Sequence, residues 1–191
     1  NLLAGTTVVL HHDPYLPEMA GPGFPVRVPR RPWAHSLGLA GSYGPPLSAL
    51  QGPGARGSGR PAFLHLAEGR GAAAADEWWR LKALGLAGPG LRLIHGLGLR
   101  WRERIELGRR GLGLVTCPVS NQRLFGHVAP VRDLARLGQA ALGTDSRLTG
   151  GRDLLAELRF ARSVNLAAPV QLYRMVSADA ARLCALRLQG G

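Results

Sequence analysis

Lysine, cysteine and long apolar runs are scarce or missing in this chain of 191 residues. Lys82 is the only lysine, so arginine supplies 23 of the 24 basic side chains. The two cysteines, Cys117 and Cys184, have no metal-ligand spacing, which argues against a disulfide framework or a zinc ribbon and favours a reducing, cytoplasmic location. No apolar run approaches the roughly 20 residues that span a bilayer, and no signal-peptide pattern opens the chain, so we expect no membrane association.

Acidic and aromatic residues are also few. The 12 acidic residues leave a formal net charge of +12, and a basic chain raises the alternative of a nucleic-acid-associated module. The arginines are scattered, however, and aromatics at 6% offer no platform for stacking bases. Nucleic acid is therefore the less favoured partner and a small-molecule substrate the expected one, while a homo-oligomer stays open.

The composition that remains is that of a globular domain. Hydrophobic residues make up 46% of the chain, enough to bury a core. The 27 glycines and 14 prolines have no fixed period, which excludes collagen and indicates many turns. Residues 38–61 are rich in both and predict a loop. The G-x-G-x-x-G pattern inside this loop follows no strand, so it does not indicate a dinucleotide site.

Short apolar runs alternate with helical patterns along the chain. The predicted strands cover residues 6–10, 24–28 (more weakly), 62–65, 91–95, 112–117 and 140–143. The predicted helices cover residues 73–86, 101–110, 131–137 and 153–164, with two short ones between 169 and 188. Such alternation is typical of βα units around a parallel sheet, either a (β/α)8 TIM-like barrel or an open doubly wound sheet.

Polar residues with metal-binding chemistry follow the predicted strands. His65, His95, Cys117 and Asp145 are separated by 30, 22 and 28 residues, which matches successive βα units. The spacing therefore predicts that they meet at the carboxyl-end rim, where barrel active sites lie. Two imidazoles and a carboxylate suit Zn²⁺ or Fe²⁺. Glu68, three residues after His65, is placed to transfer protons there.

Three motifs occur in a specific order: His65-Leu66-Ala67-Glu68-Gly69, Cys117-Pro118-Val119-Ser120-Asn121 and Gly143-Thr144-Asp145-Ser146. In this order they resemble the amidohydrolase superfamily, in particular its branch of metal-dependent aminohydrolases and chlorohydrolases with deaminase-like members. The resemblance runs nearly from end to end, with residues 29–60 lacking a clear match. It implies an α/β fold built as a distorted (β/α)8 barrel.

The resemblance also implies a reaction and a set of roles. The expected reaction is hydrolysis of a non-peptide carbon–nitrogen bond, or dechlorination, of a small heterocycle by metal-activated water. His65 and Asp145 would be metal ligands, and Glu68, His95 and Asp145 would be catalytic, with Glu68 as the proton shuttle. The expected cofactor is one divalent ion, zinc or alternatively iron. A binuclear centre is disfavoured. Such a centre in the family needs a bridging lysine, and the only lysine of this chain, Lys82, falls in a predicted surface helix.

Other polar residues are weaker candidates. His11, His35 and Asn121 are expected to contact substrate, since each lies at or near the same rim. His11 and His12 are adjacent at the end of a predicted strand, so at most one of them can face the centre of a barrel.

The sequence also departs from the family pattern. It contains no H-x-H, the family's first pair of metal ligands. We therefore expect residues 1–191 to form a partial amidohydrolase barrel, about strands 2 to 8, without the first strand and the β-sandwich domain. The alternative is a degenerate barrel that is not catalytic.

Overall fold

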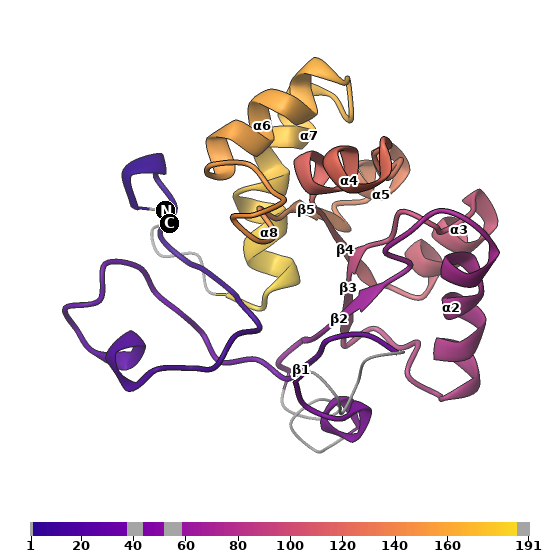
Figure 1. The fold of residues 1–191 in the computed structure, drawn as a ribbon, viewed down its shortest axis with the longest axis horizontal. Coiled ribbons are helices and arrows are strands. Elements are labelled where there is room, and N and C mark those ends of the chain that lie inside the picture. Colours follow the sequence, from indigo (N-terminus) through magenta and orange to yellow (C-terminus); the bar gives the residue numbers. More distant parts are fainter. Residues whose placement is uncertain (1, 38–43, 52–58, 187–191) are drawn as a thin grey trace.

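The computed structural model describes residues 2–37, 44–51 and 59–186, and its centre is a parallel sheet of five strands (Figure 1). The strands are β1 (Trp33–Ala34), β2 (Ala62–Leu66), β3 (Leu91–His95), β4 (Gly113–Thr116) and β5 (Ala140–Leu142). Each strand pairs with the one before it in the chain. A doubly wound sheet reverses its strand order at a switch point, whereas a barrel wall keeps the order sequential. The described sheet is therefore a section of barrel wall, and it does not close on itself.

Helices connect the strands. The α-helices are α2 (Ala72–Ala83), α3 (Trp101–Arg109), α4 (Pro118–Phe125), α5 (Arg132–Arg136), α6 (Leu154–Ser163), α7 (Pro169–Met175) and α8 (Ala178–Leu183). Short 3-10 helices cover Leu2–Ala4, Pro17–Ala20 and Leu47–Leu50. The last of these lies in the loop predicted for residues 38–61, whose G-x-G-x-x-G pattern falls outside the described residues. No helix in the described part of the chain combines the length and the apolar character needed to cross a membrane.

The strand register separates the core from the face that carries His65. Leu64, Leu93, Leu114 and Ala140 pair across β2 to β5 and belong to one buried apolar cluster. Helical residues complete this cluster, among them Trp78, Leu81, Leu107 and Leu134. Because neighbouring strand residues point to opposite faces, the next row (His65, Ile94, Val115 and Ala141) lies on the other side of the sheet.

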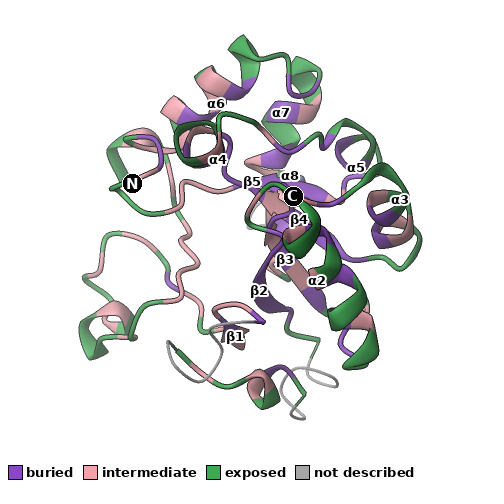
Figure 2. Ribbon diagram, turned by 45° about the vertical axis from the view of Figure 1, so that its right-hand side comes forward, coloured by how far each residue is buried: buried purple, intermediate pink, exposed green. Residues whose placement is uncertain are grey.

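The strands predicted at residues 6–10 and 24–28 were wrong. The structure has a single parallel bridge there, Val8 to Arg27, with Val9 N–H donating to the Arg27 carbonyl at 2.9 Å. Apolar β-branched residues form a strand only where a neighbouring strand continues the hydrogen bonding, and this segment has none in the described chain. Of residues 2–32 only Val28 is buried, and the segment runs outside the sheet (Figures 1 and 2).

One helix was missed. Residues 117–121 were not among the predicted helices, but Pro118 is the first residue of α4. Proline favours this position because its missing N–H has no helical partner there and its φ is already helical. Gly126 ends the helix with a φ of 65°, the left-handed conformation typical of a C-terminal cap. These signals together place Ser120 and Asn121 in a rigid first turn.

Candidate metal and active site

Three strands end at one edge of the sheet, and their last residues turn sharply. Ala67 after β2, His95 at the end of β3 and Asp145 after β5 have φ values of 53°, 71° and 56°. This left-handed conformation costs a residue with a side chain about 1–2 kcal/mol. Such strain collects at functional sites, where the surrounding structure enforces it. The three turns direct Glu68, His95 and Asp145 toward a common centre.

Glu68, His95 and Asp145 form a group of potential metal ligands. One ligand atom from each lies within 4.8 Å of the others. His95 Nε2 lies 3.5 Å from Glu68 Oε1. The His95 side chain is 1% exposed, whereas that of Glu68 is 34% exposed. The group therefore has a rigid buried side and a carboxylate that reaches solvent.

A hydrogen bond to Asn121 fixes the orientation of the His95 ring. His95 Nδ1 donates to Asn121 Oδ1 at 3.0 Å, because an amide oxygen only accepts. The other ring nitrogen, Nε2, is the atom that faces Glu68. The amide nitrogen of Asn121 is buried without a hydrogen-bond partner within the described residues. Asn121 thus fixes the orientation of His95.

His65 is held in the same way. Its Nδ1 donates to the His35 carbonyl oxygen at 2.8 Å, which leaves the lone pair on Nε2. Burial, with smaller contributions from neighbouring histidines, lowers the pKa of His65 to about 3, so the ring is neutral. Its ring stacks on that of His95, with 5.3 Å between the centroids. Metal-ligating histidines generally donate their second N–H to a carbonyl or carboxylate in this manner.

Asp145 is kept ionised by its neighbours. Burial raises the pKa of this carboxyl, but hydrogen bonds from the Ser120 and Thr149 hydroxyls and the nearby His95 outweigh it, and the pKa lies below its usual value. Both hydroxyls donate to Oδ2, the Thr149 contact being 3.1 Å long. An imidazole and two carboxylates within 4.8 Å of one another are a suitable donor set for a divalent ion such as Zn²⁺. The residues present therefore fit the cofactor that the sequence suggests.

Two further histidines extend the row of rings. His12 and His35 lie against His65, with centroids 4.7 Å and 4.9 Å away. His12 is thus the member of the adjacent pair that faces this row. His11 instead lines a second pocket, together with Asp13, Tyr15 and Trp33 among others. The structure brings His35 to the site and leaves His11 apart from Glu68, His95 and Asp145.

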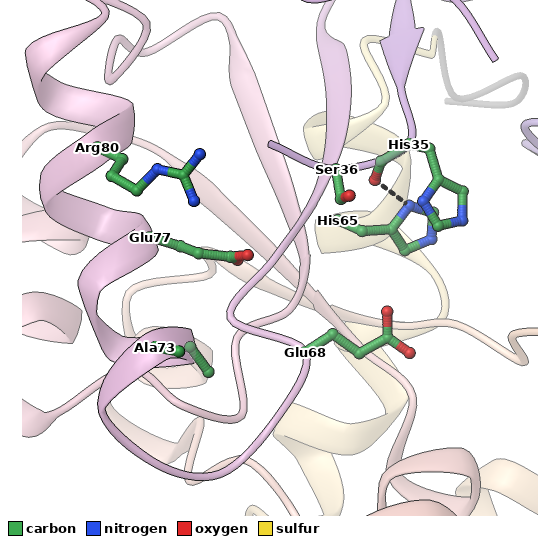
Figure 3. A pocket seen from close by; sticks show the side chains of 8 residues that line it. His35, Ser36, His65, Glu68, Ala73, Glu77 and Arg80 are labelled. Carbon is green, nitrogen blue, oxygen red and sulfur yellow. Dashed lines mark hydrogen bonds between the residues drawn. The ribbon is translucent and has the colours of Figure 1, made fainter. Parts of the chain in front are cut away.

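A pocket of about 360 Å³ opens beside the cluster. It is lined by His35, Ser36, His65, Glu68, Ala73, Ala74, Glu77 and Arg80. Figure 3 shows Glu77 and Arg80 reaching in from α2 toward the side formed by Ser36 and His65. The Ala67 N–H donates to Glu77 Oε2 at 2.6 Å, which fixes the backbone just before Glu68.

Sequence reasoning missed the residues that support this cluster from behind. Ser120 was predicted only as one position of the motif over residues 117–121, and Thr149 was not predicted at all. Glu157 was not predicted as a site residue, although a glutamate between Leu154 and Ala161 on the apolar face of a predicted helix is itself a signal. The structure shows its carboxylate fully buried.

Curated relatives were found by sequence, whereas no family model matches the chain. The 5-methylthioadenosine/S-adenosylhomocysteine deaminase of Syntrophobacter fumaroxidans is 37% identical over 112 residues, which are 53% of this chain and 26% of the relative. A protein of the same name from Haloquadratum walsbyi is 39% identical over 69 residues, 35% of this chain and 16% of the relative. The chain thus spans about a quarter or less of the curated relatives it matches.

Solved structures share the fold. An adenosine deaminase from Xanthomonas campestris with bound zinc matches with a TM-score of 0.64 and 20% identity, over 84% of this chain and 39% of that one. The atrazine chlorohydrolase from Arthrobacter aurescens TC1, complexed with zinc, matches with a TM-score of 0.61 and 21% identity, over 84% and 38%.

The fold is therefore that of an incomplete α/β barrel with a cluster of potential metal ligands at the carboxyl ends of its strands. The resemblance to the amidohydrolase superfamily is confirmed. Within it, the sequence is similar to the methylthioadenosine/S-adenosylhomocysteine deaminases.

Proposed function

We propose that this chain forms the catalytic wall of a metal-dependent hydrolase that cleaves a non-peptide carbon–nitrogen bond, or removes chloride, in a small heterocycle. The observation that carries the proposal is the convergence of Glu68, His95 and Asp145 within 4.8 Å at the ends of strands of one sheet. The names of the relatives, deaminases and a chlorohydrolase, support the reaction class. The substrate would be an aminopurine nucleoside or a related ring.

His65 and Asp145 would hold one divalent ion, zinc or alternatively iron, through the Nε2 lone pair and the ionised carboxylate. When bound, such an ion lowers the pKa of water and polarises the reacting carbon. His95 orients the substrate through its Nε2 atom, because the Asn121 contact at Nδ1 holds the ring with Nε2 toward Glu68. Glu68, 3.5 Å from His95 and partly open to solvent, takes a proton from the attacking water and delivers it to the leaving nitrogen.

His35 and Asn121 would contact the substrate, whereas His11 lines a separate pocket and is left out of the proposed contacts. The pocket beside Glu68 is of the size that holds a small organic molecule. Two free cysteines support a reducing compartment such as the cytoplasm.

Metal retention and turnover test the proposal separately. We expect His65→Ala and Asp145→Ala to lose zinc during dialysis, whereas His127→Ala, an exposed histidine, keeps it. In the product of the full reading frame, Glu68→Gln should keep zinc and release ammonia from methylthioadenosine or adenosine at least about 10²-fold more slowly. Full zinc retention by both ligand variants would contradict the assignment, and a wild type that binds no zinc would favour a non-catalytic barrel.

A further inference from the structure

Glu157 on α6 is a fully buried carboxylate that the proposed chemistry does not use. Its Oε2 accepts a hydrogen bond from the Val119 N–H at 3.1 Å, and its Oε1 accepts one from the Gly151 N–H at 2.7 Å. In the described part of the chain it has no ion-pair partner within 4.0 Å. Burial raises the pKa of Glu157, and the two backbone N–H groups oppose that rise.

Both backbone partners belong to segments that hold the candidate site. Val119 lies in the first turn of α4, directly before Ser120 and Asn121. Those two side chains bind Asp145 and His95. Gly151 lies in the segment that follows β5, which carries Asp145 itself. One carboxylate therefore connects the supports of Asp145 and His95 with the segment on which Asp145 lies.

The fit around the carboxylate is close. A Cβ at residue 151 would lie 2.9 Å from Glu157 Oε1, so only glycine leaves room for this contact. Burying a carboxylate is costly unless its oxygens are bonded. Glu157 lies on an otherwise apolar helix face and has no cation partner among the described residues. A role of its two hydrogen bonds in supporting the site accounts for a carboxylate at this position.

We propose that Glu157 is a positioning residue, whose carboxylate holds the first turn of α4 and the segment 143–152 in the register that brings Ser120 and Asn121 onto Asp145 and His95. Its consequence for metal binding rests on the proposed function. Partners that orient metal ligands from behind typically change metal affinity 10–100-fold when they are removed.

Glu103 provides the matched control. It is also a buried glutamate, and its Oε2 accepts a backbone hydrogen bond, from Arg100 N–H at 2.7 Å. That contact is local to the start of α3 and joins no second segment to the site. Glu103→Gln should therefore lower overall stability without loosening the two segments that Glu157 connects.

The experiment compares Glu157→Gln, Gly151→Ala and Glu103→Gln with the wild type. Glu157→Gln keeps the length of the side chain but turns an NH₂ group toward a backbone N–H, and the methyl group added by Gly151→Ala pushes the intact carboxylate away. Amide hydrogen exchange measures the local opening of the backbone at Val119, at residue 151 and over residues 143–149. Competition with a chromophoric chelator measures zinc affinity. We expect Glu157→Gln and Gly151→Ala to speed exchange there at least about 10-fold beyond the global change and to weaken zinc about 10–100-fold.

Equal behaviour of Glu157→Gln and Glu103→Gln, or unchanged local exchange in Glu157→Gln, would overturn the inference. If Glu157→Gln does not fold, Gly151→Ala decides alone by the same criteria. If the wild type binds no zinc, it is the proposed function that fails. The positioning role is then decided by exchange alone: faster local exchange upholds it and unchanged exchange refutes it.

Discussion

At the scale of single residues, the buried imidazole of His65 makes stability depend on pH. In the unfolded chain this ring has the ordinary pKa of 6.5, whereas in the fold it stays neutral down to about 3. The unfolded state therefore binds the proton first as the pH falls. The contribution to stability is complete above pH 6.5 and declines as the pH drops from 6.5 toward 3.

For metal-free protein in a chelator, we expect the free energy of unfolding to fall by about 2 kcal/mol from this one ring between about pH 7.5 and 5. His65→Asn, whose amide can still donate to the His35 carbonyl, should remove that part of the pH dependence. His127→Asn, at an exposed position, should leave it in place. Urea unfolding across this pH range measures the effect, and equal slopes for all three proteins would disprove it.

Some site residues could be predicted from the sequence and others could not, and the difference has a physical reason. Glu68, His95 and Asp145 follow parallel strands, whose carboxyl ends meet, so their convergence could be predicted. The contacts of Ser120 with Asp145 and of Glu157 with Val119 join residues 25 and 38 positions apart. No local pattern encodes such contacts, because they depend on how helices dock on the sheet.

At the scale of elements, α2 is anchored by one of its two adjacent tryptophans. Trp78 is fully buried, and its Nε1 donates to Glu106 Oε2 on α3 at 3.0 Å. Trp79 is 55% exposed and lies under the Lys82 ammonium, 3.6 Å from its ring centroid. Both side chains are tryptophans of the same helix, so the effects of removing each one can be compared directly.

Trp78→Ala should lower the free energy of unfolding by about 3–5 kcal/mol, because it leaves a cavity between the sheet and two helices. Trp79→Ala should cost about 1 kcal/mol or less, since it removes a surface contact with a cation. Chemical denaturation of both variants gives the two values. Comparable losses would mean that α2 does not pack through Trp78.

The elements that could be predicted are those whose own residues carry a local apolar pattern. β2 to β5 and the helices between them repeat one βα unit. The apolar residues of each strand pair with those of the next strand. β1 was missed because Trp33 and Ala34 follow Pro29 and Pro32, and only pairing with Phe63 and Leu64 makes them a strand. The run from Thr6 to Leu10 is a better strand by composition, but in the described chain it pairs only through Val8.

At the scale of the whole molecule, the candidate site is assembled from distant parts of the chain. His35, His65, His95 and Asp145 come from segments that are connected mainly through the sheet, and His12 comes from a segment outside it. An open section of barrel has fewer contacts to hold such segments than a closed barrel. A ligand that binds several of them at once should therefore stabilise the whole fold.

Zinc should accordingly raise the free energy of unfolding by mass action. At a free zinc concentration of about 100 times Kd, the gain is about 2.7 kcal/mol if only the folded state binds. Asp145→Asn should abolish this gain, whereas Asp133→Asn, an exposed aspartate on α5, should retain it. Thermal unfolding with buffered zinc measures the difference. An equal gain in both variants would show that zinc binds elsewhere, so the strand-end cluster would not be what joins these segments.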